Sequence, residues 1–152
     1  MTFVHEIITI SGLAAKVYAS YNDARDYRHI SEEVAALRVL IDKTAQHLKS
    51  TTSINDHHYG QKVLKGCQGV LVDLDCLFEK YRRLASINKR IILSIIKLGK
   101  EDIGTLYPQL LSNSGLLRGF VRRCVVRFIS ASLEILILIF YLVVTIWRCK
   151  HN

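Results

Sequence analysis

Apolar side chains recur at helical spacing along most of the chain, most clearly between Val63 and Leu84. The steps alternate between three and four residues, and the stripe comprises Cys67, Val70, Leu74, Leu77, Tyr81 and Leu84, widened by Leu64, Leu71 and Phe78. This spacing places side chains on one face of an α-helix, and the opposite face is charged. So wide a stripe must be covered by other helices, so the segment is predicted to be the centre of a bundle.

A second helix is predicted over about Ile30 to Lys49. Its stripe, again in steps of three and four, is Ile30, Val34, Leu37, Ile41, Ala45 and Leu48. The polar run 50–53 ends this pattern, and Asn55 or Asp56 can cap the helix that follows. Because the connection is short, the two helices are expected to pack as an antiparallel hairpin.

The first segment, residues 3–19, is predicted to be an amphipathic helix that is loosened near Ser11 and Gly12. Its apolar positions are Phe3, Val4, Ile7, Ile8, Leu13, Ala14, Val17 and Tyr18. Residues 20–28 are polar and favour a turn, although one helix running through to the next segment remains an alternative. The weak stripe suggests that this helix can leave the bundle and contact a membrane or a second copy.

The isoleucine-rich segment 88–98 is compatible with a short buried helix or an extended strand. Gly99 is expected to break it, and a further helix is expected to open at Glu101 and Asp102. The stripe of that helix is Ile103, Leu106, Leu110, Ser114, Leu117, Val121 and Cys124. Pro108 lies within it and is expected to kink the helix or delay its start, because proline removes the hydrogen bond to the carbonyl of Gly104.

A hydrophobic tail follows, and it is apolar around its whole circumference between Ile135 and Val144. Of the 20 residues from Phe128 to Trp147, 13 are Leu, Ile, Val or Phe. A helix of this length spans roughly 30 Å, which matches the hydrocarbon core of a bilayer. A buried core helix is the alternative, but such a helix normally keeps one polar face.

These elements predict an all-α, up-and-down bundle of four to five helices plus a C-terminal hydrophobic helix. The expected domains are a bundle over 1–124 and a candidate transmembrane tail anchor over 125–148.

Charge is distributed unevenly along the chain. Residues 1–87 contain 11 basic and 10 acidic side chains, whereas residues 88–152 contain 10 basic and 3 acidic ones. Four arginines precede the tail (Arg118, Arg122, Arg123 and Arg127), and Arg148 and Lys150 follow it. The end of a membrane helix that carries more Lys and Arg stays in the cytosol. Since more basic residues precede the tail than follow it, this bias predicts a cytoplasmic bundle on a single-pass membrane segment. The same basic region leaves nucleic-acid binding as an alternative, although few aromatic residues interleave with the arginines for base stacking.

No constellation of catalytic, cofactor-binding or metal-binding residues stands out, so no enzyme activity and no cofactor are predicted. The cysteines (Cys67, Cys76, Cys124 and Cys149) are widely spaced and form no CxxC pair. Cys67 and Cys124 fall on apolar stripes and are interpreted as core residues. His57 and His58 are adjacent, so on a helix they point about 100° apart and cannot easily share a metal. Two further pairs, Tyr27 with His29 and Asp56 with His57, are interpreted as ordinary surface pairs.

Three segments carry a resemblance to a known family. Asp26–Val34 (DYRHISEEV), Val63–Gln68 (VLKGCQ) and Lys97–Ile103 (KLGKEDI) resemble the fungal N-terminal helical domain of STAND-type receptors, the HeLo-like family. This domain precedes NACHT ATPase or ankyrin-repeat regions, and the similarity covers roughly residues 7–123. The resemblance implies a helical bundle that acts as a signalling or membrane-acting module, with protein partners or self-association and without enzyme activity.

The chain departs from that family in two respects. Pro108 interrupts a segment that usually reads as an unbroken helix. The sequence also contains no GxxxxGK[ST] phosphate loop and no repeat of about 33 residues, which NACHT and ankyrin regions would supply. Since the resemblance ends near Arg123, where the composition changes abruptly, a truncated gene product without independent function is a further alternative.

Overall fold

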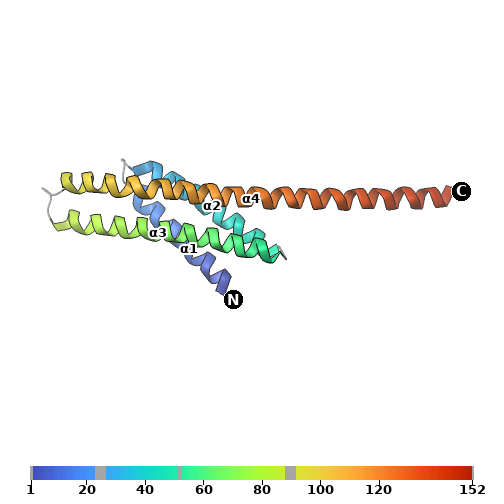
Figure 1. Cartoon of the computed structure of the whole chain (residues 1–152), viewed down its shortest axis with the longest axis horizontal. Coiled ribbons are helices and arrows are strands. Elements are labelled where there is room, and N and C mark those ends of the chain that lie inside the picture. Colours follow the sequence, from blue (N-terminus) through green and yellow to red (C-terminus); the bar gives the residue numbers. More distant parts are fainter. Residues whose placement is uncertain (1, 23–26, 51–52, 88–91, 152) are drawn as a thin grey trace.

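The described part of the chain folds into four α-helices, of which the last extends far beyond the others (Figure 1). The computed structural model describes the backbone of residues 2–22, 27–50, 53–87 and 92–151 and the side-chain burial of residues 5–22, 27–50, 53–83 and 102–147. The helices are α1 (Thr2–Asn22), α2 (Arg28–Ser50), α3 (Ile54–Ile87) and α4 (Ile92–His151). The all-α prediction is confirmed. Four helices are described, within the expected four to five, and the hydrophobic tail continues the last of them instead of forming a separate helix.

Consecutive helices run in opposite directions, and each helix packs on two neighbours. Around the bundle the order is α1, α2, α4, α3, while α1 and α4 do not touch within the described residues. The expected packing of α2 against α3 as an antiparallel hairpin is wrong, since these two helices lie across a diagonal and make less contact than any other pair of helices that touch. The wide stripe of α3 is instead covered from the sides by α1 and α4.

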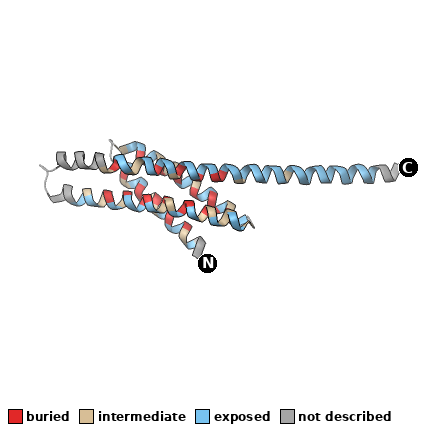
Figure 2. Ribbon diagram, viewed as in Figure 1, coloured by how far each residue is buried: buried red, intermediate tan, exposed pale blue. Residues whose placement is uncertain are grey.

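The helical stripes predicted for α2 and α3 supply most of the core (Figure 2). All six predicted positions of α2 are buried, and Cys67, Val70, Leu74 and Leu77 of α3 are buried with Leu64 and Leu71. Tyr81 and Phe78 are partly buried at one end, and the side chain of Leu84 lies outside the described residues. The core therefore follows the sequence periodicity closely in these two helices.

The first helix is better anchored than its sequence suggests. It is continuous through Ser11 and Gly12, so the predicted loosening there is wrong. Its buried side chains are Ile7, Ile10, Ala14, Val17 and Tyr21. Ile10 and Tyr21 were not in the predicted stripe, whereas Ile8 is 64% exposed. The side chains of residues 3 and 4, which the predicted stripe also included, lie outside the described residues.

The C-terminal end of α1 is tied to α3 by polar contacts. The Tyr21 hydroxyl donates a hydrogen bond of 3.0 Å to the Leu74 carbonyl. Lys16 forms an ion pair of 2.7 Å with Asp75. Helix α1 extends to Asn22, so the first residues of the predicted turn over 20–28 are helical, and residues 23–26 lie outside the described residues.

The start of α3 is capped by a residue other than those expected. The Ser53 hydroxyl accepts a hydrogen bond from the backbone N–H of Asp56, at 3.4 Å. The His57 N–H bonds to the Ser53 carbonyl at 3.1 Å, as in a regular first turn. Serine is a favoured N-cap, and Asn55 and Asp56 lie inside the helix rather than at the cap.

Helix α4 runs without interruption from Ile92 to His151, through Gly99 and Pro108. The break expected at Gly99 is therefore wrong, and Figure 1 shows no sharp kink anywhere along α4, which contains Pro108. Because Pro108 and Gly104 are exposed, the carbonyl that loses its helical partner faces solvent, where water can bond it. The helix also crosses the expected domain boundary at residues 124–125 without a break, although burial ends there.

Candidate functional site

Residues 125–147 of α4 project from the bundle and contact almost nothing else (Figures 1 and 2). Apart from the half-buried Ser132, every residue of this stretch is exposed, including large apolar side chains such as Phe140, at 69%. Within the described residues, one helical stretch, Asp102–Trp147, is long and apolar enough to cross a membrane, and its most apolar window is 0% buried. Soluble bundles rarely expose a contiguous apolar surface of this extent.

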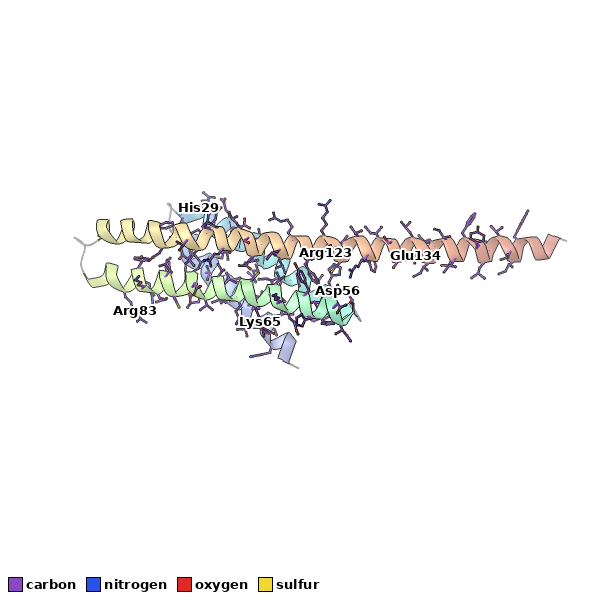
Figure 3. All side chains as sticks on the ribbon, viewed as in Figure 1. His29, Asp56, Lys65, Arg83, Arg123 and Glu134 are labelled. Carbon is purple, nitrogen blue, oxygen red and sulfur yellow. The ribbon has the colours of Figure 1, made fainter. Side chains whose placement is uncertain are left out.

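Few polar groups interrupt the tail. The hydroxyls of Ser132 and Thr145 donate to carbonyls of their own helix, at 2.9 Å to Phe128 and 2.7 Å to Tyr141. Glu134 lies on the part of α4 beyond the other helices and makes no hydrogen bond or ion pair with the described residues (Figure 3). Its carboxyl group is therefore the most polar group in this mostly apolar stretch of helix.

An ion pair between Arg127 and Asp56, which we call the clamp, holds the tail at the point where it leaves the bundle. Arg127 of α4 donates two hydrogen bonds from one guanidinium nitrogen to the two carboxylate oxygens of Asp56, at 2.8 and 2.7 Å. Asp56 lies in the first turn of α3, where the helix dipole also favours an acidic side chain. The Asp56 side chain is 21% exposed and the Arg127 side chain is 67% exposed, so water screens this pair from the Arg127 side.

Aromatic packing extends this clamp into the bundle. The Arg123 guanidinium lies 4.8 Å from the centre of the Tyr59 ring, and Tyr59 packs on Phe120 with ring centroids 5.8 Å apart. Figure 3 shows Arg123 and Asp56 at the same end of the bundle. Two small pockets of about 220 and 300 Å³ flank the clamp, and Cys124 contributes to both. The end of α2 reaches the first pocket through His47 and Ser50.

The environments of the described cysteines do not favour a reactive thiol at Cys67 or Cys124. Burial raises the pKa of the Cys67 thiol to about 12, as suits a core cysteine rather than a nucleophile. The Cys124 side chain is partly buried, which also raises its pKa. Cys76 is exposed, and the side chain of Cys149 lies outside the described residues.

Three residues of the two considered pairs, His29, Tyr27 and Asp56, contact residues outside their pair. The His29 ring packs edge-on against Tyr107, with centroids 4.8 Å apart. Tyr27 packs edge-on against Tyr21, at 6.3 Å. Asp56 binds Arg127, and no cluster of three or more metal-binding side chains occurs among the described residues.

The opposite end of the bundle carries a polar cluster between α3 and α4. The Tyr81 hydroxyl donates a 2.6 Å hydrogen bond to Asp102, and Lys80 lies 3.6 Å from the same carboxylate. The Tyr81 hydrogen bond and then the Lys80 charge lower the pKa of Asp102. Because the cluster joins two helices and lines no pocket described here, we assign it to packing.

Sequence reasoning predicted the tail and its flanking arginines but not the clamp. Asp56 and Arg127 are 71 positions apart, and only the antiparallel pairing of α3 with α4 brings them together. The comparisons with known proteins add no relative: no protein-family model, no curated protein and no solved structure matches this chain.

Proposed function

We propose that this chain is a membrane-anchored helical bundle that works as a non-enzymatic signalling or interaction module. The observation that carries the proposal is the tail, which is exposed on all sides and predominantly apolar over about the thickness of a bilayer core. In water this surface would have to be hidden by association. In a bilayer it meets hydrocarbon, and the helix satisfies its own backbone groups.

The energetics of insertion favour the membrane. Each of the 13 strongly apolar residues contributes about −0.3 to −0.6 kcal/mol near the helix centre. Glu134 opposes insertion by up to about 3 kcal/mol, and by less because it lies a third of the way into the segment. The apolar contribution therefore exceeds the cost of the carboxylate.

The arginines before the tail support a cytosolic bundle, since they outnumber the basic residues after it. The contacts of two of these arginines make the alternative, nucleic-acid binding, less favourable. Arg127 is held by Asp56 and Arg123 lies on Tyr59, so two of the four are already engaged within the chain. To bind nucleic acid, an arginine must neutralise a phosphate and so displace the counterions condensed on the nucleic acid, and an arginine that already faces a partner within the chain is less suited to this.

The membrane-facing end of such a bundle would also include the start of α1. Ser11 bonds to Asp42 and α1 runs antiparallel to α2, so the α1 N-terminus lies at the end where the tail emerges (Figure 1). Ile8 is exposed there. We therefore keep membrane contact by the N-terminal helix as part of the proposal, with Ile8 rather than the buried Ile7 and Ile10 as the contact.

The interaction role rests on the resemblance to the HeLo-like family, whose members are helical signalling or membrane-acting modules. An all-α bundle with an up-and-down path is compatible with such a domain. The expected partners are proteins or further copies of this chain, bound through helical faces.

The test is expression in cells followed by alkaline carbonate extraction of the membranes and protease digestion of intact vesicles. We expect the chain to stay in the membrane pellet, with an N-terminal epitope digested from the cytosolic side. Ile139→Lys should weaken insertion by about 2.5–3.5 kcal/mol, and Glu134→Leu should strengthen it. Recovery of the unmodified chain as a monodisperse soluble species would show that the anchor proposal is wrong.

A further inference from the structure

Among the described residues from Phe128 to Trp147, the three polar side chains that form no hydrogen bond lie on one face of α4. Between Phe128 and Trp147 the hydroxyls of Ser132 and Thr145 are satisfied by carbonyls of their own helix. The side chains of Ser130, Glu134 and Tyr141 form no hydrogen bond with the described residues. At about 100° per residue, these three side chains fall within an arc of about 40°. We call them the polar seam.

The polar seam has the spacing of a helix–helix contact. Ser130, Glu134 and Tyr141 fall on a repeat of alternating four- and three-residue steps, completed by Ile137 and Val144. Helices that present such a repeat pack at crossing angles of about 20°, both in water and in membranes. Ile137 and Val144 would provide apolar contact between the polar positions.

A lipid environment makes this seam unfavourable when left uncovered. Hydrocarbon offers no hydrogen-bond partner, and ionisable side chains in membrane helices almost always face protein or a water-filled cavity. Within the described residues no other helix of this chain reaches the seam, since all three side chains are exposed. A partner must come from another molecule.

We infer that the polar seam is the contact through which two copies of this chain associate, side by side and parallel, in the membrane. The inference rests on the proposed membrane anchoring, which places both bundles on the same side and so fixes the parallel orientation. Side chains of a helix lean toward its N-terminus, which brings the Glu134 carboxyl group toward the level of Ser130. The hydroxyl of Ser130 in one copy then donates to the Glu134 carboxyl group of the other.

The second copy is favoured as the occupant because the seam is complementary to itself. Ser130 is a hydroxyl donor and Glu134, one turn later, is a carboxyl acceptor. In a dimer with a twofold axis, the contact between this donor and this acceptor therefore forms twice, once in each direction. The bundle does not obstruct this approach: beyond Arg127 and Phe128, which line the pocket at the clamp, the tail is free of the other described helices. An unrelated membrane helix would need its own matching pattern.

The test is energy transfer between full-length copies labelled at the N-terminus with donor or acceptor and reconstituted in phosphatidylcholine vesicles. Measurements are made over a range of protein-to-lipid ratios and compared at equal amounts of bound protein. We expect transfer above that of randomly distributed labels, abolished by excess unlabelled chain.

Matched variants locate the contact. Ser130→Leu and Glu134→Leu should each weaken association about three- to thirtyfold, the range expected for losing interhelical hydrogen bonds. Glu134→Gln keeps the hydrogen-bonding capacity and should retain association. Ser132→Leu is the control, because Ser132 lies on the far side of the helix and bonds to its own backbone. It should leave association unchanged.

Each outcome has a distinct meaning. Equal weakening by Ser130→Leu and Ser132→Leu would overturn the inference, because hydrophobicity rather than the seam would then control association. A membrane-bound chain with only random transfer would overturn the inference and leave the anchor intact. A chain that fails to float with the vesicles would overturn both.

Discussion

At the scale of single residues, glycines set how closely α3 approaches its neighbours. A Cβ atom added to Gly60 would lie 2.9 Å from a methyl group of Leu48 and 3.2 Å from the ring of Phe120. Gly60 is thus the point where α2, α3 and α4 converge, next to the clamp of Asp56 with Arg127. Gly69, about two and a half turns later on the same helix, has no neighbour within 4 Å of the added atom.

These two glycines make a matched pair for a stability measurement. Gly60→Ala should lower the free energy of unfolding by about 1–3 kcal/mol, because Phe120 and Leu48 are well packed and must move. Gly69→Ala should raise it by about 0.5–1 kcal/mol through the lower backbone entropy of the unfolded chain. Thermal unfolding of the full chain in detergent micelles, followed by circular dichroism, gives both values. A stabilising Gly60→Ala would show that the three helices do not converge as tightly as described.

At the scale of elements, α4 keeps its path although proline lies in its interior. Pro108 cannot donate a hydrogen bond, and proline in a helix interior is about 3 kcal/mol less favourable than alanine. The surrounding stripe overrides this penalty, because Ile103, Leu110 and Leu117 are buried on both sides of it. Helical stability in proteins comes mostly from packing of the apolar face.

Pro108→Ala should therefore stabilise the bundle by about 1–3 kcal/mol, since the exposed position gains a backbone hydrogen bond and loses no packing. Gly115→Ala in the same helix serves as a benchmark, because it has nothing within 4 Å and should give about 0.8–1 kcal/mol. The readout is the same thermal unfolding experiment. A loss of stability in Pro108→Ala alone would indicate that the fixed backbone angle of proline helps to aim α4.

The elements also separate what periodicity can predict from what it cannot. The stripes of α2 and α3 are regular and strongly contrasted with charged residues, so their buried positions follow from the sequence. In α1 nearly every position is apolar or small, and the choice between Ile8 and Ile10 is made only by the neighbouring helices. Likewise, no local pattern reveals that α2 and α3 lie on a diagonal, because the same stripe packs against either neighbour.

The site was predictable where it depends on composition. The tail is a property of 20 consecutive residues and is visible in the sequence. The clamp depends on the register of α3 against α4, which brings together residues 71 positions apart. The polar seam was predictable only in part. Its spacing is visible in the sequence, but only the structure shows which hydroxyls bond to their own helix and which do not.

At the scale of the whole molecule, the single tryptophan reports where the chain meets the far side of a bilayer. Trp147 ends the apolar segment, and tryptophan favours the interface between lipid headgroups and hydrocarbon. Brominated lipids should therefore quench its fluorescence most when the bromine lies close to the headgroups. Moving the reporter, with Trp147→Phe and Phe140→Trp, should shift the strongest quenching to bromines near the bilayer centre. Equal quenching at all depths in both versions would contradict a fixed transmembrane register.

Because α4 is continuous from the bundle into the membrane span, the anchored molecule moves as a rigid arm about the membrane surface. From Ile92 to Phe128 the helix rises about 54 Å, and the Asp56–Arg127 clamp fixes the bundle to it just before the hydrocarbon begins. Any tilt of the span is transmitted to the bundle, so a tilt of about 20° carries the far end sideways by about 18 Å. Since tilt responds to bilayer thickness, the lateral reach of the bundle over the membrane surface becomes a function of the lipid in which it stands.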